Sequence, residues 1–383
     1  MERRLYYSLF VTILATALGA SIVVPLLPVY AQGMGASGFE LGLIFASFAL
    51  ARSFFLPVVG RLADTWGRRR FMLAGLTIYT LISIGFQQST EVWHLVLCRL
   101  IQGAAASATI PVARAYVGDM TAPGEEGRVM GHFNMAFFGG LALGPWFGGF
   151  LKDLYGISAS FYSMGLLSLF GLALSVVSLP RHDGHGPLSS QHQTSYLAML
   201  KHPMLFSIFL FRFGSIIGTG MNWTFLPLFG NNELGLSATR IGILVSVTVV
   251  MTTLLQPWFG RMADRVNRPW MTFVGGVLAS VCLMAVPLCN TFGQLLVVNL
   301  IIGSASGLFM PPLMAMAVDV GRETGFMTRV MSLLEMGFSF GMVAGPLLAG
   351  LIKETLGLRA IFLVGGGIGL LTCLIFIYTS RNR

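Results

Sequence analysis

Charged residues are scarce in this chain. They make up 10% of its 383 residues, whereas soluble domains carry about 25%. Hydrophobic residues make up 55%, and the mean hydropathy is +0.77. A chain with so few charges cannot cover a globular surface that faces water, so the composition predicts an integral membrane protein.

The chain also lacks the residue patterns of several functional classes. It has four cysteines with neither paired spacing nor companion histidines, which argues against a disulfide framework and a metal site. It has no Gly-Lys-Ser/Thr phosphate-binding loop, and no nucleophile stands beside a base within an apolar stretch. We therefore expect no metal, no cofactor and no enzymatic activity.

Twelve apolar stretches follow one another along the chain, each close to the length of about 20 residues that spans a bilayer. They lie near 6–30, 39–60, 71–88, 92–118, 128–151, 157–179, 204–229, 237–259, 270–288, 293–318, 327–351 and 359–379. The predicted fold class is an all-α integral membrane protein with twelve transmembrane helices.

The basic residues alternate between loops. The net charge is +9, and most lysines and arginines fall on one side of the membrane if both termini are cytoplasmic. This distribution follows the positive-inside rule. It accounts for the basic character of the chain without nucleic acid, and it predicts a multi-pass protein of the plasma (inner) membrane with both termini in the cytoplasm.

An internal repeat relates the two halves with an offset near 200 residues. The repeated spacing is clearest where Gly60, Asp64, Arg68 and Asp119 recur as Gly260, Asp264, Arg268 and Asp319. Each half holds an even number of helices, so the halves are parallel repeats that can enclose a midplane site and expose it to either side by rocking. The predicted domains are six-helix bundles at 1–179 and 204–383, joined by a polar cytoplasmic linker at 180–203.

Three motifs resemble those of a known family. The loop Gly60 to Arg70 matches the pattern G-x-x-x-D-x-x-G-R-[KR]-x, and its copy at 260–268 has Asn267 in place of the second glycine. The second motif is Arg99-x-x-Gln102-Gly103, and the third consists of Gly140, Gly144, Pro145, Gly148 and Gly149. Together they resemble the major facilitator superfamily of secondary transporters, especially its proton-coupled drug and small-molecule antiporters, over essentially the whole chain.

The resemblance implies that the first motif gates the cytoplasmic side. Asp64 would face the amino end of helix 11, where the helix dipole favours an anion, and Arg68 would bond Asp119. The copy in the second half consists of Asp264, Arg268 and Asp319, and the two aspartates are 55 residues apart in both halves. The alternative is that the basic residues only anchor the topology.

The third motif is similar to one associated with antiporters. Its small residues permit close helix contact, and Pro145 weakens the helical ladder so that the helix can bend. The alternative is a packing face without directional meaning, because Gly345-Pro346 in the other half looks much the same.

Few ionisable residues lie deep within the apolar stretches, where a charge is costly and functional by default. They are Arg52, Arg99, Arg114, Arg212 and Glu335. Glu335 is the only carboxylate deep within a stretch, and a buried carboxyl group can hold a proton, which suits a proton carrier. The alternative is that Glu335 is a structural partner for one of the arginines. Asn134, at the repeat position of Glu335, and Asn222 are candidate substrate contacts.

The sequence predicts a secondary active transporter that exports a small amphiphilic compound in exchange for protons by rocking two bundles within the lipid bilayer. Arginines outnumber carboxylates within the apolar stretches, which favours an anionic, zwitterionic or lipid-like substrate. One alternative is an uncoupled facilitator or lipid flippase of the same fold. Another, from a different class, is a membrane sensor or scaffold that does not transport.

Overall fold

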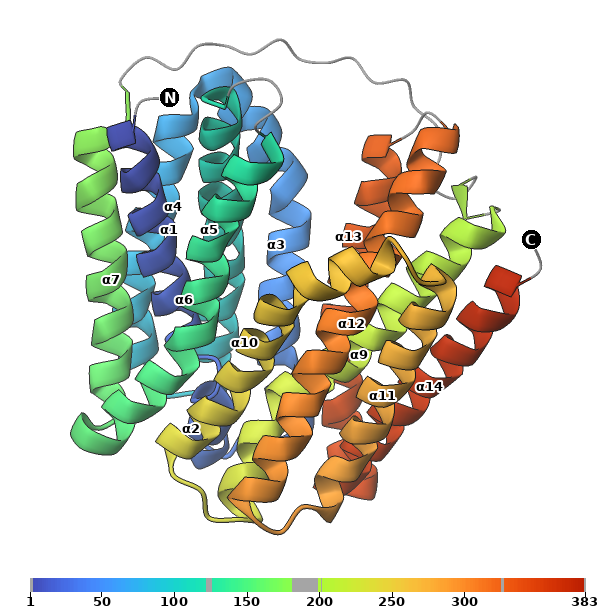
Figure 1. Cartoon of the computed structure of the whole chain (residues 1–383). Helices are drawn as coiled ribbons and strands as arrows, with labels where there is room; N and C mark the ends of the chain where they lie inside the picture. The colour runs from blue at the N-terminus through green and yellow to red at the C-terminus, as the bar shows by residue number, and fades with distance from the viewer. Residues whose placement is uncertain (1–2, 122–125, 181–198, 201, 325–326, 382–383) are drawn as a thin grey trace. The chain divides into compact units, whose positions relative to one another are not determined.

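The computed structural model describes residues 3–121, 126–180, 199–200, 202–324 and 327–381, and every regular element there is a helix (Figure 1). The first half contains α1 (Arg3–Ile22), α2 (Leu27–Gly33), α3 (Gly38–Trp66), α4 (Arg68–Gln87), α5 (Val92–Asp119), α6 (Glu126–Tyr155) and α7 (Ile157–Ser178). The second half contains α9 (Pro203–Asn232), α10 (Ala238–Ala263), α11 (Arg268–Ala285), the 3₁₀ helix η1 (Val286–Leu288), α12 (Phe292–Thr324), α13 (Met327–Leu356) and α14 (Leu358–Arg381). Most of the predicted linker, 181–198 and 201, lies outside the described residues.

Eleven helical stretches among the described residues are long and apolar enough to cross a bilayer. α1 and α2 together form the first of them, Arg3–Gly33. The twelfth helix is α6, whose 30 residues are long enough to span but include many glycines that lower its hydropathy. The predicted all-α membrane fold with twelve helices is confirmed.

The first apolar stretch is not one continuous helix. It breaks after Ile22, and the Leu26 and Leu27 amides both donate to the Val23 carbonyl oxygen, at 3.1 and 2.9 Å, in a turn. Pro25 and Pro28 lack backbone N–H groups, so they cannot continue the hydrogen bonding of α1, although proline suits the first turn of α2. The predicted membrane span near 6–30 is present, but it consists of two helices, α1 and α2, rather than one.

Contacts divide the chain into two compact units. Unit 1 comprises Met1–Ala36, Ser47–Ser189 and Ser237–Ser246, and unit 2 comprises Ser37–Ala46, Ser190–Leu236 and Val247–Arg383. In unit 1, α1 packs against α6 and α7, and α4 packs against α5 and α7. The repeat-related helices of unit 2 pair in the same way, α9 with α13 and α14, and α11 with α12 and α14. The units differ from the predicted halves at the beginnings of α3 and α10, and the division at 180–203 stays a prediction.

Close packing in unit 1 depends on glycines of α6 that face α1. A Cβ atom at Gly140 would lie 2.6 Å from the Leu18 amide nitrogen and 2.7 Å from the Leu14 carbonyl oxygen. A Cβ atom at Gly144 would collide with Ser21, whose hydroxyl donates to the Gly140 carbonyl oxygen at 3.0 Å. Small residues thus let the two backbones touch, in a solvent where helix association depends on packing rather than on hydrophobicity.

We expect Gly144→Ala to lower the free energy of unfolding by about 1–3 kcal/mol, because overpacking forces α1 and α6 apart. Thermal unfolding of the detergent-purified protein measures the effect. Gly139→Ala is the matched control on the same helix, since a Cβ atom there would meet only the end of the Leu14 side chain, at 3.6 Å. Equal stability of the two variants would contradict this account of the packing.

In each unit, a carboxylate near the end of one helix accepts hydrogen bonds from the first amides of another. Asp153 of α6 accepts from the Ala238 and Thr239 amides at 3.1 and 2.7 Å and from the Thr239 hydroxyl at 2.6 Å. Glu354 of α13 accepts from the Phe39 amide at 3.0 Å. These bonds satisfy amides that have no partner within their own helix and place negative charge at the positive end of the helix dipole. They attach the beginnings of α10 and α3 to units that do not contain the rest of these helices.

The hydrogen bonds of Asp153 predict a pH dependence. Partial burial alone would raise the pKa of Asp153, but bonds from Thr239, Ala238 and Ser237 outweigh this effect and hold the pKa below its ordinary value. The stabilisation is therefore fully present above the ordinary aspartate pKa of about 3.9. It is lost as the pH falls through the lower pKa of the folded state, where the carboxylate gains a proton.

Hydrogen exchange of the amides at 237–246, corrected for intrinsic rates, measures this loss. Protection should stay constant from about pH 7 to pH 4 and fall below that range. In Asp153→Asn, protection should be lower at neutral pH and the acid step should be absent. An acid step of unchanged size in this variant would assign it to another group.

Candidate functional site

Arginines at the beginnings of two helices bind aspartates at the ends of neighbouring helices. Arg68 of α4 forms an ion pair with Asp119, the last residue of α5. Arg268 of α11 pairs with Asp319 of α12 in the same way and lies 3.9 Å from Asp264. The pairing of Arg68 with Asp119 is confirmed, and its repeat-related copy is present in unit 2. The role of these residues in gating stays a prediction.

The backbone conformation of the residue before α4 differs from that of the equivalent residue before α11. Gly67 precedes α4 with φ +98°, a left-handed conformation that side chains disfavour. Asn267 at the equivalent position has φ −59°, and its side-chain oxygen accepts a hydrogen bond from the Trp270 amide at 3.1 Å. Asparagine can replace glycine there because it caps α11. The side chain of Asp64 lies outside the described residues, so its contact with helix 11 stays a prediction.

Exchanging the partners of the first ion pair tests the bond itself. Arg68→Asp and Asp119→Arg each bring like charges together and should lower thermal stability, whereas the double variant restores an ion pair. Asp119 is 66% exposed, so water screens the pair and we expect a coupling of only about 0.2–1 kcal/mol. The same exchange of Arg268 and Asp319 should behave alike. A double variant no more stable than the sum of its single changes would mean that the residues act separately.

Arg99 is enclosed by unit 1. It lies on α5, is 5% exposed and donates to Gln102 Oε1 at 2.8 Å. Its guanidinium carbon lies 4.3 Å from the centre of the Phe48 ring, so an amide oxygen and an aromatic face both stabilise the charge. At the equivalent position of unit 2, Asn299 Oδ1 accepts from the Thr248 hydroxyl at 3.2 Å. The burial of Arg99 favours a positioning role over direct contact with a substrate.

Arg52 and Arg114 are half-buried in unit 1. The guanidinium carbon of Arg114 lies 5.7 Å from the centre of the Phe137 ring. Arg52 lies where α3 crosses α5, since a Cβ atom at Gly103 would be 3.1 Å from the Arg52 amide nitrogen. Aromatic faces therefore accompany Arg99 and Arg114, which is favourable where little water is present.

Arg212 and Glu335 lie on neighbouring helices of unit 2, since a Cβ atom at Gly337 of α13 would be 3.4 Å from the Arg212 Cγ atom of α9. Arg212 of α9 points one guanidinium nitrogen at the Met310 sulfur, at 3.3 Å, and lies 5.2 Å from the centre of the Phe338 ring. Its Nε atom is buried and has no hydrogen-bond partner among the described residues. Glu335 of α13 is exposed on its unit, so the expectation of a buried carboxylate is wrong.

Asn134 and Asn222 carry unused hydrogen-bonding capacity. Asn134 of α6 is half-buried and Asn222 of α9 is buried, and the side-chain oxygen of each has no donor within the described chain. Such atoms are rare because they cost free energy, so both residues stay candidate substrate contacts. The hydroxyl of Thr224 is likewise buried without a partner there. No sequence pattern indicates Thr224, because threonine in an apolar helix usually bonds its own backbone.

The third motif lies entirely within α6, and the helix continues through Pro145. Besides the two glycines described above, a Cβ atom at Gly148 would collide with the Ile22 backbone of α1, and one at Gly149 would collide with the Ala238 backbone of α10. The motif therefore forms a packing face. Bending at Pro145 stays a prediction.

Sequence reasoning missed Asp153 and Glu354. A charged residue at the end of an apolar stretch is typical of a helix end that faces water, so the sequence pattern does not indicate a specific contact for either carboxylate. The repeat contained the signal, because the register that relates Gly149 to Gly350 also relates Asp153 to Glu354.

Comparison with known proteins extends over the whole chain. A family model described as Major Facilitator Superfamily matches residues 9–215 and again 208–383. The chain is 26% identical over 374 residues to Multidrug resistance protein 2 of Bacillus subtilis, covering 95% of this chain and 92% of that protein. It is 26% identical over 381 residues to Multidrug resistance protein MdtG of Salmonella dublin, covering 96% and 93%.

A crystal structure of a bacterial homologue of the human lysosomal transporter Spinster has a similar fold, with a TM-score of 0.81. The sequences are 14% identical, and the match covers 99% of this chain and 96% of that one. At this identity the likeness concerns the fold alone.

Proposed function

Because the chain belongs to the Major Facilitator Superfamily, we propose that it exports a small amphiphilic compound in exchange for protons, by alternating access of two rocking bundles. It is a multi-pass membrane transporter and not an enzyme. The names of its multidrug resistance relatives support export of amphiphiles. The distribution of basic residues supports a plasma (inner) membrane location with both termini cytoplasmic.

The observation that carries the proposal is the pair Arg212 and Glu335. Its repeat counterparts, Thr12 and Asn134, are uncharged, so the pair is not part of the duplicated framework. Glu335 is exposed and thus open to a proton or a substrate, while Arg212 is held by Met310 and Phe338. A carboxylate that can exchange a proton beside a fixed positive charge is sufficient, in the simplest case, to couple proton movement to substrate movement.

The charges of Glu335 and Arg212 restrict the charge that a substrate exchanged for protons can carry. In an antiporter, the proton and the substrate must exclude one another, which happens when a positive group of the substrate competes with the proton for Glu335. An anion bound at Arg212 would instead favour protonation of Glu335 and would couple the two fluxes in the same direction. The excess of arginines still favours a negative group on the substrate. We infer a zwitterionic amphiphile, with its cationic group at Glu335 and its anionic group at Arg212.

Transport of rhodamine B into proteoliposomes tests this mechanism. Rhodamine B has a cationic ring system and a carboxylate, and its ethyl ester lacks the carboxylate, so the two dyes are matched probes. With an acidic interior and protein-free vesicles as the background, we expect rhodamine B uptake to depend on the pH gradient and to exceed ester uptake by about tenfold, the effect of one lost charged contact of about 1.4 kcal/mol. Glu335→Gln should abolish the gradient dependence.

Two control variants separate the roles of the pair. Glu323→Gln removes an exposed carboxylate at the end of α12 and should leave the gradient dependence intact. Arg212→Gln should reduce the preference for rhodamine B over its ester. Uptake that ignores the gradient and survives Glu335→Gln would instead support an uncoupled facilitator or flippase in which Glu335 only stabilises Arg212. Uptake of the ester alone would overturn the charge argument.

A further inference from the structure

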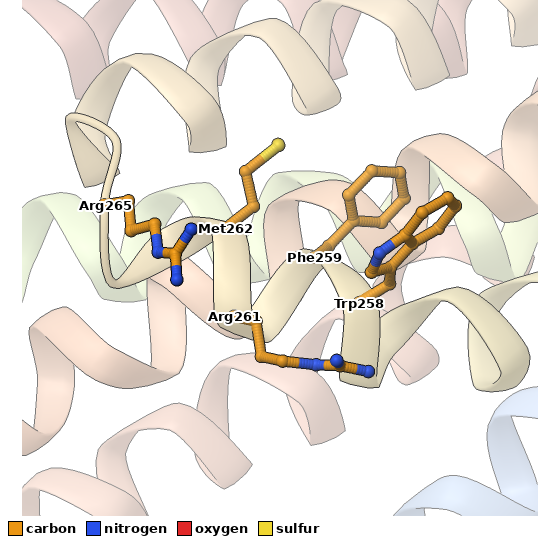
Figure 2. A pocket seen from close by; sticks show the side chains of 5 residues that line it. All are labelled: Trp258, Phe259, Arg261, Met262 and Arg265. Atoms are coloured by element: carbon orange, nitrogen blue, oxygen red, sulfur yellow. The ribbon is translucent and has the colours of Figure 1, made fainter.

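The end of α10 carries a cavity that the proposed transport cycle does not use. It has a volume of about 500 Å³ and is lined by Trp258, Phe259, Arg261, Met262 and Arg265. Figure 2 shows that these side chains come from the end of α10 and the turn that follows, with Trp258 and Phe259 at one end of the group and Arg265 at the other. All five belong to unit 2.

The apolar side of this cavity continues an exposed stripe along α10. Leu254, Trp258 and Met262 follow one another at intervals of four residues and are 66%, 68% and 37% exposed. α10 is one of the helices that are apolar enough to cross a bilayer, and tryptophan near the end of such a helix is typical of the boundary between acyl chains and headgroups. This side of the cavity therefore suits an acyl chain.

The polar side consists of Arg261 and Arg265, one helical turn apart. Neither arginine forms an ion pair with a described residue, and Arg261 Nε donates to the Pro257 carbonyl oxygen, at 3.4 Å. Guanidinium groups bind phosphate through pairs of N–H donors. Two arginines beside an apolar stripe complement a phosphate that is attached to an acyl chain.

The repeat does not account for this combination. The residues of α3 and its following turn that correspond to Trp258 and Arg265 are Val58 and Thr65, so the gate motif does not require either. We propose that the cavity binds an anionic phospholipid, with Arg261 and Arg265 on the headgroup phosphate and Trp258 beside the glycerol and the upper acyl chain. The lipid is a bound ligand of unit 2 and not the transported substrate.

Quenching of Trp258 fluorescence by brominated lipids tests the proposal. The fluorescence of Trp258 is obtained as the difference in intensity between the unaltered protein and Trp258→Phe. Both proteins are placed in phosphatidylcholine vesicles that contain either brominated phosphatidylglycerol or brominated phosphatidylcholine. Each arginine adds about fivefold to the affinity for an anionic headgroup. With two arginines, we therefore expect phosphatidylglycerol to quench this fluorescence signal at a mole fraction about 25-fold lower than phosphatidylcholine. Equal quenching by the two lipids would overturn the proposal.

Matched variants assign the preference to the cavity. Arg261→Gln/Arg265→Gln should abolish it, whereas Arg61→Gln/Arg70→Gln, which removes two exposed arginines from the equivalent region of unit 1, should leave it intact. Arg265→Thr introduces the residue that unit 1 has at the corresponding position, and it should give an intermediate lipid preference. This single variant tests the proposal even if the double variant does not fold. Equal loss in both double variants would indicate general surface charge, and relief of quenching by inorganic phosphate would indicate a free-phosphate site. Either outcome overturns the proposal.

Discussion

Polar groups that leave water for hydrocarbon need partners within the chain, and the structure follows from this constraint. It makes the spanning segments helical, since a helix satisfies its own backbone. At the membrane boundary, Asp153 and Glu354 accept hydrogen bonds from the first amides of α10 and α3, which have no partner within their own helix. Buried charge obeys the same rule, because Arg99 is held by Gln102 and an aromatic ring.

These hydrogen bonds lie near the points where two helices pass from one unit to the other. α3 and α10 each begin in one unit and continue in the other. Their first residues are held by carboxylates, with three bonds to Asp153 and one to Glu354, and both helices contain a proline near their other end, Pro57 and Pro257. A single hydrogen bond to a charged group contributes only about 1.5–3 kcal/mol, whereas the glycine contacts between α1 and α6 involve closely packed backbones that tolerate little change.

Sequence reasoning succeeded where the signal was local or repeated. Hydropathy located the helices, and the resemblance of the first motif to that of a known family implied the ion pair of Arg68 with Asp119. It failed where the answer depended on which face of a helix is covered. The average hydropathy of α13 cannot show that Glu335 is exposed. The average hydropathy of the first stretch likewise conceals the break between α1 and α2, because Pro25 and Pro28 change hydrogen bonding more than hydropathy. The bond between Asp153 and Thr239 joins residues far apart in sequence, so no local pattern reports it.

The arginines of the two duplicated ion pairs differ from Arg212 and Asn222 in how fully their hydrogen bonding is satisfied. Arg68 and Arg268 each have an aspartate partner within their own unit, as expected for residues that hold a framework together. By contrast, Arg212 and Asn222 have buried polar atoms without a partner in the described chain, and neither residue is duplicated. An unsatisfied buried group lowers stability, so it persists where something other than stability maintains it. A ligand whose polar groups complete this hydrogen bonding would maintain such atoms, which supports the proposal that Arg212 and Asn222 contact the substrate.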